Sequence, residues 1–112
     1  DICGFLMSTD LSDSADWHAV YNGGTTTGQT VSTSNDLGDD AVAGEWQILR
    51  MEIDPNGTAR WYTDGALQKT VTGAVSTTVD LCFNCITESK TTAVKTMDVD
   101  YIYISANRDF NA

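Results

Sequence analysis

Residues 45–72 read EWQILRMEIDPNGTARWYTDGALQKTVT, and this stretch decides the fold class. Leu49, Met51 and Ile53 occupy every second position of its first part. This two-residue period is typical of a β-strand with one buried face. Two further alternating stretches follow, and the three together predict an antiparallel meander.

Two turn motifs separate these three stretches. Asp54-Pro55-Asn56-Gly57 places Pro where a turn requires φ of about −65° and Gly where φ can be positive. Asp64-Gly65 is a strong signal for a two-residue hairpin turn. Because each motif reverses the chain, the second stretch (59–63) should pair with the stretches before and after it.

Shorter alternating or apolar stretches occur along the rest of the chain. We expect further strands at Ile2–Met7, Trp17–Tyr21, 29–33, Val79–Cys85 and Met97–Ser105, the third of them at a sheet edge. No window of ten or more residues shows the 3.6-residue period of an amphipathic helix. The sequence therefore predicts an all-β fold, an antiparallel β-sandwich, with little helix.

The length of 112 residues predicts one domain, residues 1–112. Neither an internal repeat nor a Pro-rich linker divides the chain. The sequence begins at Asp1 without Met, and we expect it to be part of a longer chain.

The charge of the chain is strongly negative, with 16 acidic against 6 basic residues and a formal net charge of −10. Binding of DNA, RNA or anionic lipid depends on Lys and Arg that neutralise phosphates. The basic residues are also dispersed, so we expect no nucleic-acid partner. The sequence has neither a run of 18 apolar residues nor a signal-peptide pattern, and we expect no membrane association.

Three cysteines stand at positions 3, 82 and 85, the last two with C-x-x-C spacing. In a strand, residues three apart point to opposite faces, so the thiols of Cys82 and Cys85 would not converge on one metal. A second ligand pair is also missing, because the only histidine is His18. We expect buried structural cysteines or one disulfide, with Cys3 bound to Cys82 or Cys85 as the first pairing to test.

No catalytic constellation is recognisable in the sequence. His18 could act as a general base, but no nucleophile motif accompanies it. Glu52-Ile53-Asp54 is only part of the Glu-x-Asp-x-x-Glu strand motif of jelly-roll glucanases. We predict that the chain is not an enzyme and has no catalytic residues.

Aspartates cluster in two presumed loops, and these clusters could in principle bind calcium through carboxylate oxygens. The clusters are Asp10, Asp13 and Asp16, and Asp36, Asp39 and Asp40. Neither has the D-x-D-x-D-G register of a dedicated calcium loop. We therefore predict solvated acidic loops, no bound metal and no cofactor, with calcium as the alternative.

The aromatic residues could form a platform for sugar rings. Trp46 and Trp61 stand on strands that we expect to be neighbours, which favours packing in the core or on a sheet face. Trp17 and Tyr21 lie beside a polar, Gly-rich loop and are the pair that we expect to be exposed. They are the candidates for a sugar-binding site.

The motifs of residues 44–65 and 99–103 resemble those of a known family. They are Gly44-Glu45-Trp46, the LRMEID run from Leu49, the GTA run from Gly57, the WYTDG run from Trp61, and VDYIY from Val99. This pattern is similar to the C-terminal half of concanavalin A-like (laminin-G-like) jelly rolls, especially those of bacteriophage virion proteins. Because family domains are often longer, N-terminal strands would lie outside this chain or come from a neighbouring subunit.

The resemblance implies a function by association rather than catalysis. We expect a bacteriophage virion structural protein, either a head decoration or cement subunit or a tail-surface subunit. Its partners would be other virion subunits and further copies of itself, and its location the virion. The alternative is a carbohydrate-binding module, with calcium assisting the contact between the loop aspartates, Trp17 or Tyr21 and the sugar.

Overall fold

The computed structural model describes residues 1–27 and 35–106 of the chain. It divides into two compact units, Asp1–Leu81 and Cys82–Ala112, which are described separately. The prediction of a single domain over residues 1–112 stays a prediction. All the described strands belong to the first unit.

The first sheet of this unit contains β1 (Ile2–Leu6), β2 (Asp16–Asn22) and β3 (Asp36–Asp40), in the order β1-β2-β3. Both pairings are antiparallel. The strands expected at Ile2–Met7 and Trp17–Tyr21 are thus confirmed. The strand expected at 29–33 lies outside the described residues, and the sequence did not predict β3.

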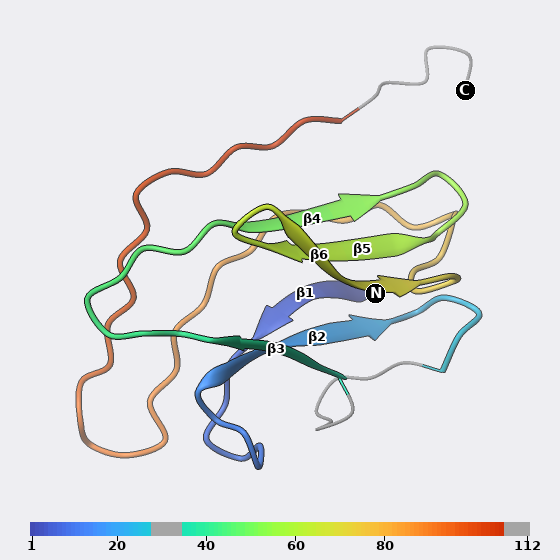
Figure 1. Ribbon diagram of the computed structural model, residues 1–112. Coiled ribbons are helices and arrows are strands. Elements are labelled where there is room, and N and C mark those ends of the chain that lie inside the picture. The colour runs from blue at the N-terminus through green and yellow to red at the C-terminus, as the bar shows by residue number, and fades with distance from the viewer. Residues whose placement is uncertain (28–34, 107–112) are drawn as a thin grey trace. The chain divides into compact units, whose positions relative to one another are not determined.

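The second sheet contains β4 (Leu49–Ile53), β5 (Ala59–Thr63) and β6 (Ala66–Val71), in the order β4-β5-β6. It is the predicted antiparallel meander, with Met51 opposite Trp61 in the register of β4 and β5. Figure 1 shows its three strands joined by tight turns, above the β1-β2-β3 sheet.

The two predicted turns have the expected backbone geometry. The amide of Gly57 donates to the carbonyl of Asp54 over 2.9 Å, and Gly57 has φ of 83°. Asp64 and Gly65 both have positive φ, 47° and 84°, as a type I′ hairpin turn requires. Asp64 is the only described non-glycine residue with positive φ, which its short polar side chain tolerates.

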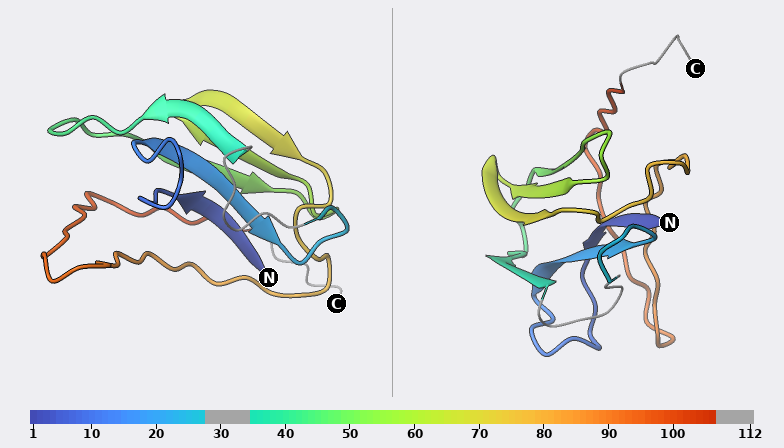
Figure 2. Two further views of the ribbon diagram at one scale, coloured as in Figure 1. Left: turned by 90° about the horizontal axis from the view of Figure 1, so that it is seen from below. Right: turned by 90° about the vertical axis from the view of Figure 1, so that its right-hand side faces the viewer.

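One hydrophobic cluster is shared by both sheets, which face each other in the first unit (Figure 2). Its buried members are Ala19, Tyr21, Leu37, Ala59, Trp61, Val71 and Ala74. Trp61 is fully buried, its ring lies 5.9 Å from that of Tyr21, and its indole N–H donates to the carbonyl of Gly4 over 2.7 Å. The core position predicted for Trp61 is confirmed.

The packing predicted for Trp46, in the core or on a sheet face, is wrong, because this residue is 69% exposed. It precedes β4 rather than lying in it, and therefore has no place in the pleat of the sheet. A bulge also changes the pattern of β6. The register shifts so that Leu67 lies opposite Tyr62, on the outward side, while Val71 lies opposite buried Ala59.

Residues 82–106 are the described part of the second unit and contain no strand. The strands expected at Val79–Cys85 and Met97–Ser105 are therefore wrong. Every residue from 82 to 106 is exposed, including Phe83, Ile86 and Tyr103. A strand needs a partner for its N–H and C=O groups, and no two-residue turn signal joins either stretch to a neighbour.

The fold class is confirmed at the level of an all-β fold with two three-stranded antiparallel sheets.

Candidate functional site

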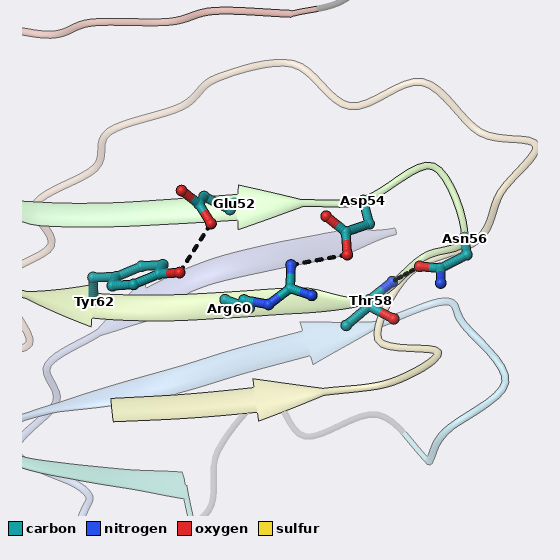
Figure 3. A network of polar contacts seen from close by, with 6 residues as sticks. All are labelled: Glu52, Asp54, Asn56, Thr58, Arg60 and Tyr62. Atoms are coloured by element: carbon teal, nitrogen blue, oxygen red, sulfur yellow. Dashed lines mark hydrogen bonds and ion pairs between the residues drawn. The ribbon is translucent and has the colours of Figure 1, made fainter. Parts of the chain in front are cut away.

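The outward side of β4 and β5 carries a polar network (Figure 3). Arg60 donates to Asp54 over 2.8 Å, and the hydroxyl of Tyr62 donates to Glu52 over 2.9 Å. Both contacts are diagonal across the strand pair, since Glu52 lies directly opposite Arg60. Such cross-strand pairs form because every second residue of each strand points outward.

The hydrogen bonds of this network shift the pKa values of the two residues that donate them. The hydrogen bond to Glu52 is the main cause of a raised pKa for Tyr62, and the bond to Asp54 is the main cause of a raised pKa for Arg60. Arg50 adds a contact of 3.6 Å to Glu52, and its guanidinium lies 4.0 Å from the centre of the Tyr62 ring. The carboxylates of Glu52 and Asp54 are thus engaged in pairing, as in a sheet-stabilising ladder.

The two aromatic ligand candidates are not an exposed pair. Tyr21 is 6% exposed and packs in the core, so the expectation that it is exposed is wrong. Trp17 is partly buried, stacks edge-on against Phe5, and donates to Gln47 over 2.9 Å. Odd-numbered residues of β2 face the shared cluster, and this parity places both rings on its inner side.

All three cysteines are free thiols in the structure. Cys3 is partly buried on β1, and its thiol lies 3.4 Å from the sulfur of Met51. Burial raises the pKa of Cys3 to about 12. Cys82 and Cys85 are exposed, and the disulfide between either of them and Cys3 stays a prediction.

Three aspartates from the two predicted acidic clusters meet at one point of the first sheet. Each of Asp13, Asp16 and Asp36 offers one carboxylate oxygen, and these oxygens lie within 4.8 Å of one another. The amide of Asp16 donates to the carbonyl of Asp13 over 3.4 Å, which folds the preceding loop onto the start of β2. Pairing of β2 with β3 places Asp36 opposite His18.

The sequence did not bring these three aspartates together. It left the two clusters as separate loops because β3 was not predicted. The strand reads DLGDD, and Asp and Gly are depleted in strands. The only available signal was the single apolar Leu37, which is 5% exposed and reaches the core.

An open hollow also lies in the first unit, with a volume of about 190 Å³. It is lined mainly by turn residues, among them Gly23, Thr25, Asn56, Gly73 and Ser76. No aromatic or titratable side chain is among its lining residues, so it offers neither a stacking surface nor an acid–base pair.

Comparison with protein-family models, with curated proteins and with solved structures gave no match. In residues 1–27 and 35–106, no helix has the length and apolar character that crossing a membrane would require.

Proposed function

We propose that this chain is a non-enzymatic structural subunit that works by associating with other protein subunits. The observation that carries the proposal is the second unit, where residues 82–106 are exposed and contain no strand. Met97, Val99, Tyr101 and Tyr103 are each at least 43% exposed. Such a run of large apolar side chains is typical of a surface that a partner covers.

The backbone of this unit supports association by strand addition. Its alternating stretch 97–105 has the pattern of a strand but contains no strand. An extended segment can join the edge of another chain's sheet, where main-chain hydrogen bonds provide affinity and side-chain pockets provide specificity. The first unit offers such edges, because among the described strands β1, β3, β4 and β6 each have one neighbour in their sheets.

We infer that the first unit is a β-sandwich of the concanavalin A-like jelly-roll kind. Two antiparallel sheets with a shared cluster support the sandwich, and the motifs of residues 44–65 support the family. From that resemblance we propose a bacteriophage virion as the setting, with the chain on the head as a decoration or cement subunit or on the tail surface. The net charge of −10 fits a protein partner better than packaged nucleic acid.

The test of association is light scattering coupled to size-exclusion chromatography over a concentration series, with hydrogen exchange on each species. We expect a larger species at high concentration in which the amides of residues 97–105 exchange slowly. Tyr101→Lys should shift the equilibrium toward the monomer, because it puts a charge into the covered stretch. Val94→Lys is the matched control, since Val94 is 87% exposed outside that stretch.

A monomer at every concentration, with residues 97–105 unprotected, would contradict self-association. Purified phage particles test the setting: the intact mass of this chain should be found among the particle proteins. Binding to a glycan array by the monomer would favour the carbohydrate-binding alternative instead.

A further inference from the structure

Asp16 is a buried residue with one carboxylate oxygen that has no hydrogen-bond partner among the described residues. The residue is 5% exposed, and its Oδ1 atom is buried without a hydrogen-bond partner. Removing an ionised carboxylate from water is costly unless a cation or hydrogen-bond donors replace the water. The basic residues Arg50 and Arg60 pair with Glu52 and Asp54 on the other sheet.

Asp16 also stands beside two further carboxylates. Negative charges so close repel one another. The Oδ1 atom of Asp36 accepts a hydrogen bond from the amide of Gly38 over 2.6 Å. The arrangement therefore concentrates three carboxylates at one point of the first unit.

Two neighbouring side chains show the same lack of a polar partner. In the described part of the chain, the buried side-chain atoms without a hydrogen bond are Asp16 Oδ1, His18 Nε2 and Asn35 Nδ2. All three belong to β2 or to the residue just before β3. The Nδ1 atom of His18 lies 3.0 Å from the carbonyl oxygen of Asp16, which can only accept a hydrogen bond. Nδ1 is therefore the donor in this contact, and Nε2 is the ring nitrogen without a partner.

We propose that Asp13, Asp16 and Asp36 form a binding site for a hard divalent cation, and that Ca²⁺ is the ion it takes. Three carboxylate oxygens within 4.8 Å of one another suit an ion that accepts six to eight oxygen ligands in flexible geometry. Asp13 is exposed, which leaves an entry path and room for water to complete the ligand set. The proposal does not depend on the proposed function, since it concerns only the first sheet.

The experiment is a calorimetric Ca²⁺ titration of the intact chain after removal of metal with EDTA, with thermal unfolding measured in EDTA and in Ca²⁺. We expect one site with a Kd on the order of 10⁻⁴ M or tighter and a higher Tm in Ca²⁺. Asp16→Asn should weaken binding at least about tenfold. Asp39→Asn, on the same strand as Asp36 and with the same change of charge, should leave the Kd within about twofold.

A second readout separates a cation site from a merely structural aspartate. In EDTA, Asp16→Asn should melt no lower than the unmodified chain, because it relieves the repulsion among the three carboxylates. In Ca²⁺ the order should reverse, with the unmodified chain melting higher. If Asp16→Asn does not fold, Asp13→Asn at the exposed ligand provides the same comparison of affinities.

Three results would overturn the proposal. They are a titration without Ca²⁺ binding, an equal loss of affinity in Asp39→Asn, and a response to Zn²⁺ without a response to Ca²⁺. The oligomeric state does not enter any of these readouts, so this site and the association of subunits can fail separately.

Discussion

The β4-β5-β6 meander and residues 97–105 have similar sequence patterns but different structures. Both alternate apolar and polar residues over a strand's length. The meander forms three hydrogen-bonded strands, whereas residues 97–105 are exposed and contain no strand. The difference lies in the turns, since each strand of the meander is joined to its partner by a short reversal.

The comparison shows that a strand-like sequence pattern is not sufficient for a strand to form. Alternation gives a segment one face to bury, but the backbone still needs a partner on at least one side. A tight turn supplies that partner at a small cost in chain entropy. A segment without such a turn must find its partner far away in the sequence or on another chain.

Trp61→Ala should have the largest effect on stability and would test the meander directly. The side chain is fully buried, so we expect a loss of about 3–5 kcal/mol in the free energy of unfolding. Trp46→Ala is the matched control, because Trp46 is 69% exposed and should change stability by less than about 0.5 kcal/mol. Urea unfolding measures both, and equal losses would contradict the assignment of the core.

Gly57→Ala and Gly65→Ala compare the two turns of the meander. Both glycines have positive φ, which costs a non-glycine residue about 1–2 kcal/mol. A Cβ at Gly65 would meet open space, whereas a Cβ at Gly57 would collide with the carbonyl oxygen of Val75. We expect a loss of about 1 kcal/mol for Gly65→Ala and about 2–4 kcal/mol for Gly57→Ala. The reverse order in urea unfolding would mean that residues 73–75 do not pack under the first turn.

Thiol reactivity compares the two regions without any mutation. Cys3 is partly buried with a raised pKa, whereas Cys82 and Cys85 are exposed. Because the thiolate is the reactive form, iodoacetamide near pH 8 should label Cys82 and Cys85 at least about tenfold faster than Cys3. Peptide mass spectrometry identifies the labelled sites. A disulfide that includes Cys3 would be found in the same experiment and would contradict the free thiols.

Stability at high pH should depend on Cys3. The folded chain holds the thiol proton up to about pH 12, whereas an unburied thiol has a pKa of 9.0. The unfolded state therefore loses this proton first, and the free energy of unfolding falls as pH rises from about 9 toward 12. The stability falls rather than rises because the pKa of Cys3 is higher in the folded chain, and below pH 9 the free energy of unfolding keeps its full value with respect to this group. Cys3→Ala should show a smaller fall between pH 8.5 and pH 10.5 in urea unfolding.

Tyr103→Ser should have the smallest effect on stability and tests the exposed stretch 97–105. Tyr103 is 81% exposed, so the dilute monomer should lose less than about 0.5 kcal/mol. A larger loss in the monomer would show that residues 97–105 are already packed within one chain.

Local chemistry made much of the meander predictable. Pro55 and Gly57 in one turn and Asp64-Gly65 in the other specify backbone angles, and alternation assigned Trp61 inward and Tyr62 outward. The same reasoning failed for Tyr21, because a Gly-rich neighbourhood says nothing about which face of a strand is buried. It also failed for β3, whose Asp-rich sequence opposes strand formation and is outweighed by pairing with β2.

Local sequence specified where the meander reverses and which residues of β5 point inward, because turn angles and side-chain alternation are local properties. The pairing of distant segments depended instead on the tertiary structure. It brought Asp13, Asp16 and Asp36 to one point, and the bulge between β5 and β6 turned Leu67 outward. These contacts depend on strand register and on the balance of burial and hydrogen bonding over the whole sheet, which no short stretch of sequence contains.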